Sequence, residues 1–327
     1  MNLIKKISIR VLILLPALIL LNQIYKATFY ESDLVKMNAD LLEDIKKAQY
    51  SADIIYFGES SDFSVHPDDS SNTPISGLVA EMLPTKKLYS ACKEAIHGAD
   101  YLSLLRNIED NSRVKTVVVT MNLRSFNSDW INSELETLLS RSNVMYQLRP
   151  PLVNRFLVSL NAFDNKSAKS RREQIGRDWK ENTLVFPFAF NYKNVAVWDS
   201  AMSWGGHKNQ DSSWNQPKIE LACHYIKTYA FQIDVNSNPR IKDFDEMVNV
   251  CKQKKLRLVL NILSENVHYA DSLVGKELVY LIKQNRDLLV DRYSKKGAIV
   301  VDNLEVVNGK DFIDQNSFLL KKEIYTS

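Results

Sequence analysis

Short apolar runs alternate with longer amphipathic stretches through most of the chain after residue 50. The longer stretches have apolar residues at helical spacing and comprise Ile75–Leu83, Ala99–Ile108, Ile241–Lys254 and Ser272–Lys295. The short runs are continuously apolar, as is typical of strands covered on both faces, and comprise Asp53–Phe57, Lys87–Ala91, Lys115–Met121, Arg257–Leu263 and Ala298–Asp302. Strands that alternate with helices predict an α/β fold with a parallel sheet flanked by helices.

Residues 126–240 interrupt this alternation between the third and fourth predicted strands. The segment has no convincing strand pattern, but it has helical patterns at Trp130–Ser142, Leu152–Phe163 and Pro217–Gln232. It also holds all five tryptophans, which are Trp130, Trp179, Trp198, Trp204 and Trp214. We interpret it as a helical insertion over the carboxyl edge of the sheet. The tryptophans then pack within the insertion, or Trp204 and Trp214, which lie in polar loop sequence, offer ring faces to a sugar or an acyl chain.

The first 30 residues have the pattern of an export signal. Lys5, Lys6 and Arg10 precede the apolar run Val11–Tyr25, and a positive flank of this kind stays in the cytoplasm. The run reaches the length of a membrane span when it is extended to Tyr30. No small-x-small cleavage site follows it, which favours an uncleaved anchor over a cleaved signal peptide. A buried helix of a soluble protein is the third interpretation.

The anchor hypothesis divides the chain into three parts. Residues 1–30 form the anchor, residues 31–52 form a stalk helix with helical spacing over Leu34–Gln49, and residues 53–327 form the main domain. The positive flank predicts a single-pass protein of the inner (cytoplasmic) membrane, with its main domain on the extracytoplasmic side.

Charge and cysteine content argue against several classes of protein. A net charge of +3 on 327 residues, without a basic stripe between aromatics, argues against nucleic-acid binding. Cys92, Cys223 and Cys251 are odd in number and form no Cys-x-x-Cys pair, which argues against a disulfide scaffold or a zinc module. No phosphate-binding glycine-rich loop is evident. We therefore expect neither a metal nor a cofactor.

Candidate chemistry follows the first three predicted strands. After the first strand, Gly58 permits a sharp turn and leaves Ser60 at the carboxyl end of the sheet, where open α/β sheets bind ligands. After the second, the N–H of Gly98 can approach a substrate oxygen, and after the third, the amide of Asn122 can donate to a developing oxyanion. Each residue also has a structural interpretation, as a helix cap, a loop glycine and a turn residue respectively.

The order Gly58-Glu59-Ser60, Gly98 and Asn122 resembles the first three motifs of the SGNH (GDSL-like) hydrolases, with Glu59 in place of their usual Asp. Segments 56–61 and 120–126 are similar to a bacterial membrane-anchored branch, which resembles the D-alanyl-lipoteichoic acid biosynthesis protein and alginate O-acetylation factors. The resemblance covers about 53–125 and 255–316. It implies a flavodoxin-like three-layer α/β/α domain with Ser60 as nucleophile and Ser61 as its rival. The oxyanion hole would comprise the backbone N–H groups of Ser60 and Gly98 and the side chain of Asn122.

The family's catalytic base has no clear counterpart. A serine hydroxyl needs a base, which in this family is a His close to an Asp near the C-terminus. Asp314 fits the family's Asp, but Ser317 stands where the His is expected. A later run also lacks the His, because it has Ile324 at the matching position. His97 and His207 are the candidate substitute bases.

Two functions remain open from the sequence. The first is a membrane-anchored serine esterase or O-acyltransferase that acts on acyl esters of cell-envelope glycans, with a membrane-bound acyltransferase as a partner. This enzyme is inactive in the present chain if a truncation or frameshift after about Asn316 removed its base. The alternative is a non-catalytic envelope protein that binds a glycan or a partner through the aromatic rings of the insertion.

Overall fold

Five parallel strands form the sheet of the computed structural model, which describes residues 3–64, 72–309 and 312. Tyr56 pairs with Ser90 on one side and with Val118 on the other, and the order across the sheet is β2-β1-β3-β4-β5. The strands are β1 (Ile54–Gly58), β2 (Leu88–Cys92), β3 (Thr116–Met121), β4 (Arg257–Ile262) and β5 (Ile299–Asp302). Each begins and ends within one residue of its predicted run, which confirms the α/β class and the parallel sheet.

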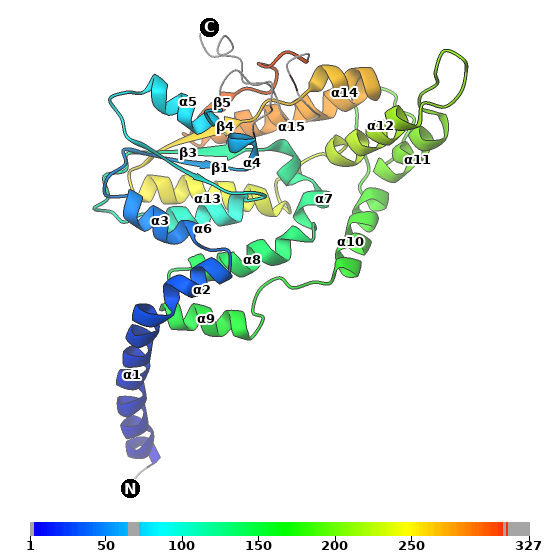
Figure 1. Cartoon of the computed structure of the whole chain (residues 1–327). Coiled ribbons are helices and arrows are strands. Elements are labelled where there is room, and N and C mark those ends of the chain that lie inside the picture. Colours follow the sequence, from blue (N-terminus) through cyan, green and yellow to red (C-terminus); the bar gives the residue numbers. More distant parts are fainter. Residues whose placement is uncertain (1–2, 65–71, 310–311, 313–327) are drawn as a thin grey trace.

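One face of the sheet packs against three helices. Side chains alternate between the two faces of a strand, and Phe57 of β1 points to α6 (Gly98–Arg106), where its ring lies 5.6 Å from that of Tyr101. Next to α6 lies α13 (Pro239–Gln253), whose Phe244 is 6.0 Å from Tyr293 of α15 (Lys276–Lys295). Figure 1 shows α6 and α13 below the sheet and α5 (Ile75–Met82) on its other side. The short helix α4 (Ser60–Phe63) precedes α5 in the connection from β1 to β2.

Three predicted helices are interrupted in the structure. The stalk helix consists of α2 (Tyr30–Lys36) and α3 (Leu41–Ala48), and Asn38 between them has a φ of 58°, a left-handed conformation that ends helices and that Asn tolerates. Gly275, with a φ of 120°, separates α14 (Val267–Leu273) from α15 in the same way. The third, predicted over Trp130–Ser142, consists of α7 (Ser128–Ile131) and α8 (Leu135–Tyr146). Helical spacing continued across these breaks, so periodicity alone did not reveal them.

The insertion between β3 and β4 is helical. After the short 3-10 helix η1 (Leu123–Phe126) it continues through α7 and α8 to α12, all of which Figure 1 shows in green shades. Its later helices are α9 (Pro151–Ser159), α10 (Ala168–Glu181), α11 (Val195–Gly205) and α12 (Gln216–Tyr229). Residues 126–240 are all described, and their strand-like pairing is limited to an isolated bridge between Lys208 and Trp214.

The N-terminal helix α1 (Leu3–Thr28) projects from the rest of the protein (Figure 1). Its segment Arg10–Thr28 has 19 residues, and 6% of an 18-residue stretch within it is buried. By length and composition alone, this helix is long and apolar enough to cross a membrane. Its last turns contact α9, where the N–H of Leu152 donates a 3.0 Å hydrogen bond to Oδ1 of Asn22.

Candidate functional site

The motif residues after β1 and β3 lie at the same edge of the sheet because these neighbouring strands are parallel. Gly58 is the last residue of β1 and Ser60 the first of α4. A Cβ atom on Gly58 would lie 2.6 Å from Sγ of Cys92 at the end of β2. Glycine is therefore required here by the close approach of two strand ends, in addition to the turn that follows.

A hydrogen bond joins the two motif segments directly. The Nδ2 of Asn122 donates to Oε1 of Glu59 over 2.5 Å, and its Oδ1 accepts from the backbone N–H of Arg124 over 3.0 Å. Both ends of the Asn122 amide are thus fixed, and the side chain is 7% exposed. An amide nitrogen carries two hydrogens, so one remains to donate to another acceptor. This places a fixed donor at the strand end next to that of Ser60.

Glu59 is a buried carboxyl group with several stabilising partners. Burial raises its pKa, whereas the charge of Arg124 and hydrogen bonds from Asn122 and Ser61 lower it. Asn122, Ser61 and Arg124 thus favour the ionised form of this carboxyl group against the effect of burial.

A second buried carboxyl group, Glu265, lies just beyond β4. It is 4% exposed, and burial raises its pKa to about 7, an effect that the charge of Arg124 partly offsets. The Oη of Tyr229, at the end of α12, donates to its Oε2 over 2.5 Å. Sequence reasoning missed Glu265, although the polar run Ser264-Glu265-Asn266 directly follows the fourth apolar run, as Asn122 follows the third.

Arg124 connects these groups to open space. Its guanidinium lowers the pKa of both Glu59 and Glu265 and lies 5.5 Å from the ring of Trp130. Arg124, Trp130 and His224 also line a pocket of about 370 Å³. The polar edge of the sheet is thus continuous with a cavity that has a cation and an aromatic ring in its wall.

His97 and Gly98 begin α6 near the same edge. The Nε2 of His97 lies 3.0 Å from Oε1 of Glu136, and its Nδ1 accepts the N–H of Ala99 over 3.3 Å. Buried Arg240 pairs with the same Glu136. Both ring nitrogens of His97 therefore lie against groups other than Ser60. The charge of His97 also lowers the pKa of Glu59. Among the described residues, no hydrogen bond joins a histidine to Ser60.

The remaining predicted site residues lie elsewhere or outside the described residues. The Nε2 of His207 is 2.6 Å from the carbonyl oxygen of Leu273 and fixes the loop between α11 and α12 to α14. Trp204 is 83% exposed, and Trp214 has the ammonium group of Lys208 at 4.7 Å from its ring centroid. Trp204 lies in the last turn of α11 and not in the predicted loop, whereas Trp214 lies in the segment between α11 and α12. Among the described residues, no hydrogen bond or ring contact joins either tryptophan to Ser60. Asp314 is not among the described residues.

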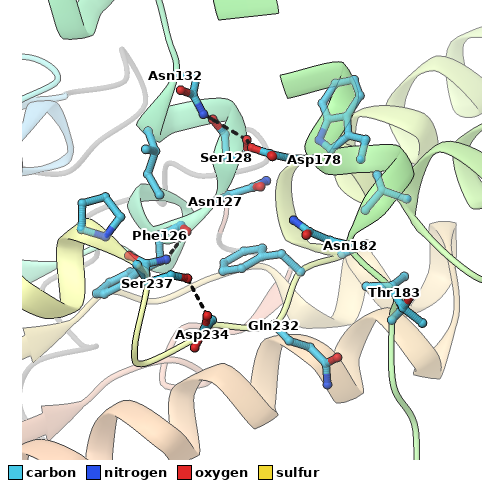
Figure 2. Close-up of a pocket in the computed structure, with 18 residues that line it drawn as sticks. Phe126, Asn127, Ser128, Asn132, Asp178, Asn182, Thr183, Gln232, Asp234 and Ser237 are labelled. Atoms are coloured by element: carbon cyan, nitrogen blue, oxygen red, sulfur yellow. Dashed lines mark hydrogen bonds between the residues drawn. The ribbon is translucent and has the colours of Figure 1, made fainter. Parts of the chain in front are cut away.

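A second cleft, of about 440 Å³, lies between α7, α10 and residues 230–239 (Figure 2). Ser128 donates to Asp178 on one side of it, and Ser237 donates to Asp234 over 2.5 Å on another. The rest of its wall combines carboxamides, a hydroxyl and rings, among them Asn127, Asn132, Asn182, Thr183, Gln232, Phe126, Trp179 and Phe231. No lysine, arginine or histidine of the described chain lines it. The charged side chains of its wall are the carboxylates of Asp178 and Asp234, so the cleft disfavours an anionic ligand.

No protein-family model matches the chain, and no curated protein matches its sequence. In the part of the chain that the structure describes, no group of three or more His, Cys, Asp or Glu side chains could hold a metal ion. The sheet and its polar carboxyl edge define an α/β protein in which buried Glu59, Asn122 and Glu265 lie near half-buried Arg124, beside two pockets.

Proposed function

We propose that the chain is a membrane-anchored SGNH-type serine esterase or O-acyltransferase that acts on acyl esters of cell-envelope glycans. Ser60 is the nucleophile, and the N–H groups of Ser60 and Gly98 with the side chain of Asn122 stabilise the oxyanion. The observation that carries the proposal is the 2.5 Å hydrogen bond between Asn122 and Glu59, the residue that precedes Ser60.

The strand order supports the flavodoxin-like part of this proposal. The order 2-1-3-4-5 is that of flavodoxin-type sheets, which bind ligands where the order reverses, between β1 and β3. Ser60 follows β1 and Asn122 follows β3, so the two residues flank this position.

The cleft of Figure 2 supports a glycan as the substrate class. Phe126 and Asn127 line this cleft, and they follow Asn122 closely in the sequence. Neutral hydrogen-bonding groups beside aromatic rings suit sugars, because a sugar ring has hydroxyl groups around its edge and apolar C–H groups on its faces.

One observation favours non-catalytic binding as a second function. His97 and His207 both have other partners, so Ser60 has no histidine base among the described residues. Loss of a triad member typically lowers the rate by about 10⁴-fold or more. A protein of this ancestry would then retain its glycan or partner and cleave nothing.

Labelling with a fluorophosphonate probe, together with p-nitrophenyl acetate turnover, tests the enzymatic proposal. We expect the full chain in detergent to be labelled once, at Ser60, and Ser60→Ala to abolish both label and turnover. Ser61→Ala is the matched control and should keep the label. Turnover that survives Ser60→Ala refutes the assignment. A wild-type chain that takes no label but binds an envelope glycan points to the second function.

A further inference from the structure

A basic cleft of about 630 Å³ lies where α1 ends and the rest of the protein begins. Its wall includes two carboxylates, Glu109 and Asp110. It also includes five cationic side chains, which are Lys26, Lys46, Arg106, Arg149 and Lys254. The cleft is separate from the Ser60 edge and has no part in the function proposed above.

Three of these cations have no carboxylate partner. Lys254 lies 3.7 Å from Asp110, and Arg106 lies 3.1 Å from Glu246, so these two are paired. Within the described residues, no carboxylate lies within 4.0 Å of the remaining three, which are Lys26, Lys46 and Arg149. Glu109 is also engaged, by a 2.6 Å hydrogen bond from Oη of Tyr50. The cleft therefore has an excess of positive charge that its own wall does not balance.

Lys46 is the inner cation of this group. Its ammonium group lies 5.5 Å from the ring centroid of Tyr30. Burial lowers its pKa, the nearby carboxylates of Glu43 and Glu109 raise it, and the charge of Lys26 lowers it. The lysines thus disfavour each other's charge, and an anion between them would relieve this repulsion.

The cleft lies level with the end of the candidate membrane span. Lys26 is in the last turn of α1, and Asn22, one turn earlier, accepts the hydrogen bond from Leu152 of α9. Arg155 of α9 forms a second tie, at 3.0 Å, to Asp33 of α2. If α1 spans a bilayer, α9 and the basic cleft lie at the lipid surface.

The outward face of α9 is apolar. Val153, Phe156 and Leu160 follow one another at helical spacing and are 42%, 60% and 60% exposed. Its buried residues are Asn154 and Val158. The exposed face thus presents three large apolar side chains, which suit a lipid environment. Leu148, which is 68% exposed and lines the cleft, connects the apolar face to the cations.

We propose that this cleft binds the phosphate headgroup of an anionic membrane lipid, whose acyl chains lie along the apolar face of α9. Lys26, Lys46 and Arg149 supply the charge, and a phosphate is the anion that a bilayer surface presents at this depth. The proposal depends on α1 spanning the membrane and not on the chemistry of Ser60.

Native mass spectrometry of the full chain in dodecyl maltoside tests the headgroup site. With equal amounts of phosphatidylglycerol and phosphatidylcholine added, we expect the chain to retain phosphatidylglycerol selectively. Lys26→Gln and Arg149→Gln, both at exposed positions, should each weaken retention by about fivefold, as expected for about 1 kcal/mol per basic residue. Lys218→Gln, an exposed lysine outside the cleft, should change nothing. Equal retention of the two lipids overturns the proposal.

Two further experiments distinguish a bound lipid from free phosphate and from a protein partner. Inorganic phosphate at millimolar concentration should not displace the lipid, and displacement would assign the cleft to free phosphate.

In lipid vesicles, a fluorophore on Phe156→Cys should be quenched by doxyl-labelled lipid and protected from iodide, whereas one on exposed Val185→Cys should respond to iodide alone. Iodide access at position 156 in pure lipid vesicles overturns the lipid contact of α9. Protection found only in native membranes would then indicate a protein partner.

Discussion

The hydrogen bond from Tyr229 Oη to Glu265 Oε2, 2.5 Å long, joins the end of the helical insertion to the carboxyl edge of the sheet. Both residues are buried, at 3% and 4% exposure. The hydrogen bond from Tyr229 and the charge of Arg124 favour the ionised form of Glu265. Burial disfavours that form by removing it from water, and burial is the larger effect.

The raised pKa of Glu265 predicts a pH-dependent stability. Its pKa is about 7 when folded, so between about pH 4.5 and pH 7 the folded protein binds more protons than the unfolded chain. The contribution of Glu265 to the free energy of unfolding is therefore greatest below about pH 4.5. It falls as the pH rises through this window, by at most about 3 kcal/mol. Thermal unfolding in detergent should show this decline in the wild type and a flatter profile in Glu265→Gln. Parallel profiles for the two proteins would contradict the assignment.

Removal of the Asn122 amide should affect both stability and reactivity. In Asn122→Ala, buried Glu59 loses a donor, which costs about 1–3 kcal/mol of unfolding free energy. If the second amide hydrogen stabilises an oxyanion, the rate of fluorophosphonate labelling at Ser60 should also fall, by about 10²–10³-fold. Comparison with Ser125→Ala, whose hydroxyl donates to the Asn122 carbonyl, controls for local disturbance. A destabilised variant with unchanged labelling would leave Asn122 with a structural role alone.

The close approach at Gly58 predicts a steric effect that a second substitution relieves. Gly58→Ala should destabilise the protein by about 1–3 kcal/mol, because its Cβ would lie 2.6 Å from Cys92 Sγ. Cys92→Ala added to it should restore part of the loss. Gly176→Ala in α10, where a Cβ meets nothing within 4 Å, is the matched control. We expect that change to stabilise the helix by about 0.5–1 kcal/mol. Equal effects at the two glycines would count against the packing argument.

Loss of Arg240 should be far more costly than loss of a surface arginine. Arg240 is 4% exposed and pairs with Glu136, which also faces His97. Arg240→Met removes the arginine partner of this largely buried carboxylate and leaves it with His97 alone, at a cost of about 3 kcal/mol. Arg113→Met, which breaks an exposed pair with Asp53, should cost less than about 1 kcal/mol. Chemical unfolding measures both, and similar midpoints would show that the buried pair is not stabilising.

The cleft of Figure 2 should distinguish saccharides by charge. Calorimetry should detect binding of the neutral trisaccharide chitotriose but not of trigalacturonate, because no cationic side chain of the described residues lines the cleft. Asn182→Ala should weaken binding by about fivefold through the loss of about one hydrogen bond. Glu181→Ala, a neighbouring exposed residue outside the cleft, is the control. Tighter binding of the uronate would contradict the proposed ligand class.

The strands were predictable because buried parallel strands have continuous apolar runs, and their ends placed Ser60 and Asn122 at one edge. The partners of these residues were not predictable in the same way. Glu265 and Tyr229 are 36 residues apart, and only the return of the chain from the insertion to β4 brings them together. The engagement of His97 by Glu136 likewise depends on how α8 packs against α6. The helix breaks at Asn38 and Gly275 depend on a single left-handed backbone conformation each, which apolar periodicity does not report.

The tie between Asn22 and Leu152 has a mechanical consequence. This hydrogen bond joins α1 to α9 at a second point, in addition to the chain that follows α1, and so restrains the orientation of α1 relative to the rest of the protein. If α1 spans a bilayer, the fold would then set the distance of the carboxyl edge from the lipid, and any ligand of that edge would have to be presented at that height.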